Sequence, residues 1–147
     1  MTWQPGPGVV ELPDGVRLRG RRLRGGADPE PFPEWSLILL GKPPTDIAGP
    51  HRWLRWPDFW LPVDAWDARA AFEEAHRLAA GGVRVEVACG GGRGRTGTAL
   101  ACIAQLGGIA AENATAWTRA NYHSHAIETP WQRRYIRRFA RSGVGSS

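Results

Sequence analysis

The chain has 147 residues, 42% of them hydrophobic, which is enough for one domain with a real core. The net charge is +5 and every basic residue except Lys42 is arginine, so the charge favours an anionic ligand without arguing for nucleic acid. No apolar run approaches the roughly 20 residues that cross a membrane, and no signal peptide opens the chain. We therefore expect a monomeric, cytoplasmic, single-domain protein over 1–147, without a nucleic-acid partner or a membrane span.

The first part of the chain predicts a hairpin and a buried strand. Residues 1–8 are rich in proline and glycine and are expected to be loose. Apolar residues over 9–12 and 16–19 flank the turn sequence Pro-Asp-Gly, which predicts a hairpin. The arginines between 17 and 24 are interpreted mainly as a solvated face, with attraction of an anionic substrate as the second interpretation. A buried strand is predicted over 35–40.

The stretch 51–62 reads HRWLRWPDFWLP and places a carboxylate directly after a strand. A strand is predicted over 52–56, and Pro57 cannot continue it. Asp58 then lies on a loop at the strand's end, where polar chemistry is commonly placed. The tripeptide Trp-Pro-Asp alone fits equally well with a loop whose aspartate caps a turn.

Four helices are predicted from the spacing of apolar residues, over 65–80, 96–106, 112–120 and 130–141. Asp64 is the expected cap of the first and Thr129 of the last. Trp66 and Trp131 are assigned to the buried faces of these two helices. The alternation of strands and helices predicts an α/β fold: a central, mostly parallel sheet with helices on both faces and an N-terminal β-hairpin.

The sequence VRVEVACGGGRGRTG over 83–97 carries the chemistry. A strand with alternating valines leads to Cys89, a glycine-rich loop and Arg95, and a helix follows. Glycines let backbone N–H groups turn inward, the helix N-terminus adds further donors, and a guanidinium matches two phosphate oxygens. A thiolate beneath a bound phosphoryl group is a nucleophile placed to attack phosphorus. The alternative interpretation is a glycine-rich turn with a buried cysteine.

Three segments resemble the cysteine-dependent protein tyrosine phosphatase superfamily. Ala88-Cys89-GGGRG-Arg95-Thr96-Gly97 is similar to its motif His-Cys-x5-Arg-Ser/Thr-Gly. Residues 56–62 are similar to its acid loop, Trp-Pro-Asp-x-Gly-x-Pro, and precede the cysteine as in the tyrosine-specific and dual-specificity branches. Residues 126–132 resemble a third, weaker motif that ends in glutamine.

The resemblance implies a role for each matching residue. Cys89 becomes a cysteinyl-phosphate, Asp58 protonates the leaving oxygen, and Gln132 helps to position the hydrolytic water. Thr96 is expected to donate a hydrogen bond to the sulfur. The residues expected to bind the phosphate are Gly90, Gly91, Gly92, Arg93, Gly94 and Arg95. No metal or cofactor is expected.

Phosphotyrosine in proteins is the first expected substrate. Two residues depart from the family pattern and are expected to affect the rate of turnover. Ala88 replaces the usual histidine, which predicts weakened turnover, and Trp60 replaces the glycine of the acid loop. The basic Arg93 inside the loop favours the alternative of a phosphoinositide or another small phosphate ester. A phosphate-binding module with little turnover is the rival from another class, and a sulfurtransferase fits less well because it would not need Asp58.

Overall fold

The computed structural model describes residues 2–25 and 29–144, with side chains up to residue 140. Within them one sheet has the strand order β1-β2-β5-β3-β4. The β1–β2 pair is antiparallel and the other neighbouring pairs are parallel, which confirms the mostly parallel sheet and the N-terminal hairpin. The strands are β1 (Val9–Glu11), β2 (Arg17–Arg22), β3 (Trp35–Leu40), β4 (His51–Arg55) and β5 (Val85–Cys89).

The helices follow the predicted order, with two changes at their ends. Asp64 caps α1 as predicted, because its side chain accepts hydrogen bonds from the amides of Trp66 and Asp67. The second helix begins two residues earlier than predicted, so Arg95 belongs to its first turn. The predicted helix 112–120 is a short 3₁₀ turn, Ala111–Asn113, followed by α3. The α-helices are α1 (Ala65–Ala80), α2 (Gly94–Leu106), α3 (Ala114–Asn121) and α4 (Pro130–Val144). None of the described helices has both the length and the apolar composition needed to cross a bilayer.

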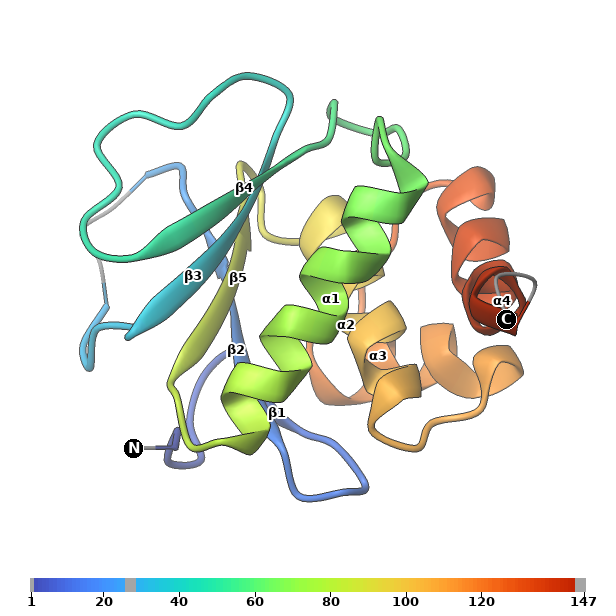
Figure 1. Cartoon of the computed structure of the whole chain (residues 1–147), viewed down its shortest axis with the longest axis horizontal. Helices are drawn as coiled ribbons and strands as arrows, with labels where there is room; N and C mark the ends of the chain where they lie inside the picture. The colour runs from blue at the N-terminus through green and yellow to red at the C-terminus, as the bar shows by residue number, and fades with distance from the viewer. Residues whose placement is uncertain (1, 26–28, 145–147) are drawn as a thin grey trace.

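All four α-helices lie on one side of the sheet (Figure 1), so the expectation of helices on both faces was wrong. The core forms between these helices and inward-facing strand residues such as Leu37, Leu39 and Val87. The opposite face carries Ser36 and Glu86 and is bordered by loops. The reason is local: the connection from β3 to β4 runs over 41–50, contains three prolines and forms no helix.

The N-terminal segment is anchored rather than loose around Trp3. The Trp3 side chain is only 1% exposed, and its indole N–H donates to the carbonyl of Val85 over 2.8 Å. The guanidinium of Arg19 lies 4.0 Å from the centre of the Trp3 ring, within the range of a cation–π contact. The expected looseness of 1–8 is therefore wrong for the residues around Trp3, and Met1 lies outside the described residues.

Candidate active site

The thiol of Cys89 lies at the base of the glycine-rich loop, at the carboxyl end of β5. The residue is 2% exposed, and its sulfur accepts hydrogen bonds from the amide of Gly92 at 3.1 Å and the hydroxyl of Thr96 at 3.0 Å. The hydrogen bond predicted from Thr96 is therefore present. Two donors converging on one sulfur stabilise it as an anion, which is the form that attacks an electrophile.

The loop holds this shape because Gly92 adopts a left-handed backbone, with φ of 72°. A Cβ built on Gly92 would lie 2.8 Å from the backbone nitrogen of Arg22, so glycine is required here for close approach as well as for conformation. From the other side, the hydroxyl of Tyr122 donates to the carbonyl of Gly92 over 2.6 Å. Burial raises the pKa of Tyr122 above its usual value, so that the phenol remains a donor.

Arg95 lies in the first turn of α2 with its side chain buried against Gly90 of the loop. One terminal nitrogen donates to the carbonyl of Trp56 at 3.1 Å, and the other lies 3.4 Å from a carboxylate oxygen of Asp58. Its Nε is buried and has no hydrogen-bond partner among the described residues. Leaving a buried donor unpaired costs about 1–3 kcal/mol, more for a charged group, and a phosphate oxygen within hydrogen-bond reach would satisfy it.

Two further arginines reach this pocket from β2 and the loop after it. The parallel pairing of β2 with β5 places Arg22 opposite Cys89. Arg24 follows, and its guanidinium lies 3.8 Å from Asp58. These arginines were predicted to lie mainly on a solvated face, because no local pattern in the sequence shows that β2 neighbours β5.

The pocket formed by these groups has a volume of about 380 Å³. Its walls include every expected phosphate-binding residue except Gly92, whose amide donates to the sulfur of Cys89, and Arg95, which lines the neighbouring larger cavity. Glu128, which sequence analysis gave no role, adds a negative charge at the rim. The lining residues are Arg22, Arg24, Asp58, Phe59, Cys89, Gly90, Gly91, Arg93, Gly94 and Glu128.

The acid loop after β4 is tied to helix α4. The indole of Trp131 donates to the carbonyl of Phe59 over 2.6 Å and stacks on the ring of Trp60 with centroids 5.4 Å apart. Beneath them, the indole of the buried Trp56 donates to the carbonyl of Trp60 over 2.7 Å. Trp131 is 41% exposed, so its assignment to a buried helix face was wrong; it packs on a loop instead of the core.

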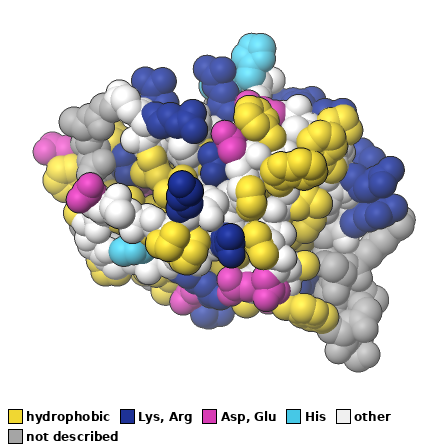
Figure 2. Space-filling model, turned by 90° about the horizontal axis from the view of Figure 1, so that it is seen from above, with side chains coloured by type: hydrophobic (Ala, Val, Ile, Leu, Met, Phe, Trp, Pro, Cys, Tyr) yellow, Lys and Arg dark blue, Asp and Glu magenta, His cyan; other side chains and the backbone are white. Residues whose placement is uncertain are grey.

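Trp66 was also assigned to a buried helix face and is 67% exposed. It lies at the start of α1, ahead of the part of the helix that reaches the core. Viewed from above the carboxyl ends of the strands, hydrophobic side chains gather beside basic ones at this end of the molecule (Figure 2).

Gln132 lies under the acid loop and does not line the pocket. Its side-chain oxygen accepts hydrogen bonds from the amides of Glu128 and Thr129, at 2.9 and 3.2 Å. Its side-chain nitrogen lies 3.4 Å from the carbonyl of Trp60. In this conformation the carboxamide holds backbone groups at the start of α4 and in the acid loop.

The remaining sequence-derived features have structural positions of their own. Ala88 is fully buried, between Arg21 of β2 and Ile38 of β3 in the register of the sheet. Cys102 is buried in α2, and burial raises the pKa of its thiol well above the usual value. Within the described residues, His, Cys, Asp and Glu side chains form no group of three or more that could hold a metal ion.

Known structures share this architecture at low sequence identity. The active form of Tk-PTP is similar with a TM-score of 0.72 and 18% identity, covering 93% of this chain and 99% of that one. Kinase-associated phosphatase with its catalytic cysteine replaced by serine gives 0.62 and 18%, covering 78% and 72%. PTPMT1 in complex with PI(5)P gives 0.63 and 17%, covering 77% and 80%. No curated protein sequence matches the chain.

The sequence also matches a family model over residues 64–142, more than half of the chain. The model describes the DSP-PTPase phosphatase domain of Swiss Army Knife proteins. The match includes Cys89 and Arg95 and begins after Asp58. The assignment of Asp58 to the site therefore depends on its position in this structure, where it lines the pocket. The chain therefore belongs to the Swiss Army Knife family of dual-specificity-type phosphatase domains, within the cysteine-dependent protein tyrosine phosphatase superfamily.

Proposed function

We propose that the protein hydrolyses phosphate monoesters through a cysteinyl-phosphate intermediate, with phosphotyrosine in proteins as the first candidate substrate. One observation carries the proposal: the sulfur of Cys89 is held by two donors at a pocket, and the buried Arg95, which lies against Gly90 of the same loop, has an Nε with no partner among the described residues. A phosphoryl group would use both features at once. The thiolate would meet phosphorus, and the guanidinium would meet an equatorial oxygen.

The reaction has two steps with the atoms in balance. In the first, the sulfur of Cys89 forms a bond to phosphorus, the ester P–O bond breaks, and Asp58 gives its proton to the departing oxygen. In the second, water attacks the phosphorus, Asp58 takes a proton from that water, and the S–P bond breaks. Inorganic phosphate leaves and the thiolate is restored.

The other expected residues support these steps. Arg95 and the amides of 90–94 stabilise charge on the equatorial oxygens, and Thr96 stabilises the sulfur as it departs. For Gln132 we propose a positioning role, because its carboxamide holds the acid loop through the carbonyl of Trp60. Since Ala88 places no imidazole behind the glycine-rich loop over 90–94, we expect modest turnover.

A small phosphate ester, including a phosphoinositide, is the second candidate substrate. The exposed Arg93 lines the pocket and would meet an additional negative charge. A structure with this fold, PTPMT1, has been solved with PI(5)P, which fits the same interpretation.

The test is the Cys89→Ser variant, assayed without added metal against aryl phosphates, phosphopeptides and phosphoinositides. We expect the parent to turn over at least one of these and the variant none, while the variant still binds inorganic phosphate. Hydrolysis by the serine variant at a substantial rate would exclude the thiol as nucleophile. A parent that binds phosphate but hydrolyses nothing would instead identify a phosphate-binding module.

A further inference from the structure

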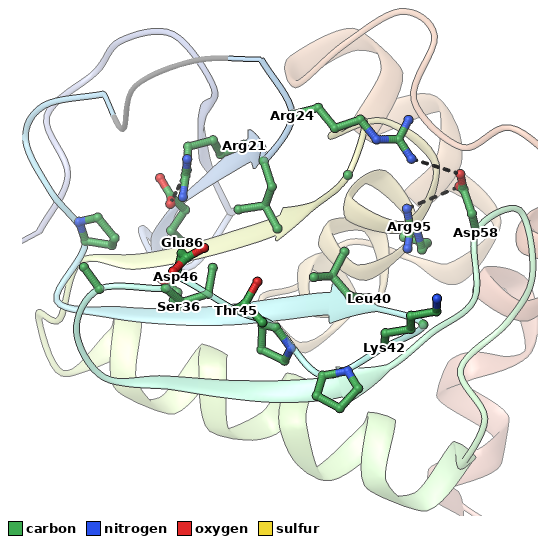
Figure 3. Close-up of a pocket in the computed structure, with 18 of the residues that line it drawn as sticks. Arg21, Arg24, Ser36, Leu40, Lys42, Thr45, Asp46, Asp58, Glu86 and Arg95 are labelled. Atoms are coloured by element: carbon green, nitrogen blue, oxygen red, sulfur yellow. Dashed lines mark hydrogen bonds and ion pairs between the residues drawn. The ribbon is translucent and has the colours of Figure 1, made fainter.

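A second, larger cavity lies beside the phosphate pocket, over the face of the sheet that carries no helix (Figure 3). Its volume is about 650 Å³, against about 380 Å³ for the phosphate pocket. Arg24, Asp58 and Gly90 line both cavities, so the two are continuous at the acid. A volume of this size lies in the range of about 300–1,000 Å³ typical of small-molecule sites.

The position of Asp58 decides which part of a substrate enters this cavity. In an in-line displacement, the leaving oxygen lies on the side of phosphorus opposite the attacking sulfur. That oxygen must also come within hydrogen-bond reach of its acid. Because Asp58 stands on the boundary between the two cavities, the group attached to the leaving oxygen extends into the larger one.

The walls of the cavity change character along its length. Next to the phosphate pocket, the middle section of the cavity is lined by apolar side chains. Toward the far end, hydroxyl groups and a carboxylate join the apolar side chains (Figure 3). The apolar residues of the cavity are Leu23, Phe32, Pro33, Leu40, Pro43, Pro44, Ile47 and Ala48, and the uncharged hydroxyls and the carboxylate of the far end are Ser36, Thr45 and Asp46.

Charge is also distributed unevenly. At the catalytic end Arg24, Lys42 and Arg95 face the single carboxylate of Asp58, so this end has an excess of positive charge. That excess suits the dianionic phosphate.

At the far end, positive and negative side chains balance. The buried Glu86 accepts hydrogen bonds of 2.7 Å from both Arg19 and Arg21. Asp46 supplies the second carboxylate of this end. Two guanidiniums and two carboxylates leave no net charge, which suits a polar group that is itself uncharged.

We propose that this cavity binds the alcohol part of the substrate. That alcohol has an apolar segment, which lies over Leu40, followed by uncharged amide or hydroxyl groups, which lie beside Ser36 and Asp46. The proposal rests on the phosphatase activity proposed above and adds the chemical class of the leaving group. A capped phosphotyrosine residue has this pattern, with its ring followed by neutral amides, and so does a small ester of a comparable alcohol.

The experiment compares three aryl phosphates that share the reacting group. Para-nitrophenyl phosphate ends at the ring, para-propylphenyl phosphate extends it without amides, and N-acetyl-phosphotyrosine amide extends it with neutral amides. We expect the kcat/KM of the capped amino acid to exceed that of the propyl ester about tenfold, the gain from two hydrogen bonds of ordinary strength.

Two variants test the far end without touching the catalytic groups. Thr45→Trp adds bulk at an exposed loop position, and Asp46→Gly removes the carboxylate and its hydrogen-bonding capacity while keeping a residue type that accepts the φ of 59° found there. Both should bring the ratio between the two extended esters close to one and leave turnover of para-nitrophenyl phosphate unchanged. Glu73→Gln, an exposed carboxylate on α1, is the control of equal charge change and should keep the parent ratio.

The outcomes separate the two proposals. The cavity proposal is overturned if the parent hydrolyses para-nitrophenyl phosphate but has equal kcat/KM for the capped amino acid and the propyl ester. It is also overturned if neither variant lowers the ratio of these two values. In both cases the proposed phosphatase activity stands. Failure to hydrolyse any ester overturns both. A longer phosphotyrosine peptide shows whether the alcohol belongs to a protein or to a small ester. A kcat/KM above that of the capped amino acid indicates a peptide substrate, and an equal or lower kcat/KM indicates a small ester.

Discussion

Gly91 and Gly92 are adjacent glycines, yet the two positions differ in whether they can accept a side chain. Gly92 has φ of 72°, and a Cβ on it would lie 2.8 Å from the backbone of Arg22. A Cβ on Gly91 would meet no atom within 4 Å. The difference makes Gly91 a matched control for Gly92.

Gly92→Ala should therefore strain the backbone and turn the amide away from the sulfur of Cys89. A residue held in such a conformation costs of the order of 1–3 kcal/mol. We expect a lower melting temperature and a large loss of kcat/KM, whereas Gly91→Ala should stay near the parent in both. Equal behaviour of the two variants in thermal unfolding and turnover assays would contradict this account of the loop.

Asp58 is 41% exposed on its side chain and lies between two guanidiniums, where it can reach a leaving oxygen. Asp58→Asn removes the proton donor at constant size. General acid catalysis typically contributes about 100- to 10,000-fold, so turnover of an unactivated alkyl or aryl phosphate should fall by about that factor. Para-nitrophenyl phosphate, whose leaving group needs little protonation, should lose far less. An equal loss on both kinds of ester would place the acid elsewhere.

At the scale of elements, the acid loop and α4 act as one unit. Trp131 and Gln132 both bond to carbonyls of this loop, and Phe59 within it has a φ of 65°, which is unusual for a non-glycine residue. The loop is thus held in place by a helix whose sequence lies more than 70 residues away.

Trp131→Ala should loosen this unit and misplace Asp58 without removing it. Displacement of a catalytic group by about 1 Å can cost roughly a hundredfold, so we expect a fall of between about ten- and a hundredfold on unactivated esters. Para-nitrophenyl phosphate should be affected little, because it depends little on the acid.

Trp66→Ala is the matched control, since Trp66 is an exposed tryptophan that makes no ring contact with the acid loop among the described residues. It should retain parent activity on both kinds of ester. If both variants lose activity equally, exposed aromatic surface rather than the tie to the loop is responsible.

At the scale of the whole molecule, local patterns in the sequence predicted the helices and strands but did not predict which of them lie side by side. The Asp64 cap, the buried strand 35–40 and the order strand, Cys89, loop, helix all depend on adjacent residues, and the structure has each of them. The pairing of β2 with β5 depends on contacts between residues about 67 positions apart, as in the bond from Arg19 to Glu86. Arg22 and Arg24 were consequently missed as pocket residues.

The same limit explains the other errors. A tryptophan at helical spacing indicates an apolar contact without saying whether the partner is the core or a loop, and for Trp131 it is a loop. The helix-free face follows from the connection between β3 and β4, which forms no helix, but which face the remaining helices cover depends on the handedness and order of the whole sheet.

The proposed nucleophile and the proposed acid come from different parts of the chain. The cradle with its nucleophile lies within residues 64–142, the part shared with the family, whereas the acid and most of the wall of the larger cavity come from the residues before it. Sequence change in the leading segment that spares Asp58 would therefore alter the cavity proposed for the alcohol while the nucleophile and its loop stay the same. On the cavity proposal, family members that agree over the later half should differ in the alcohol that they release, and the segment before the shared domain should predict that difference better than the cysteine motif does.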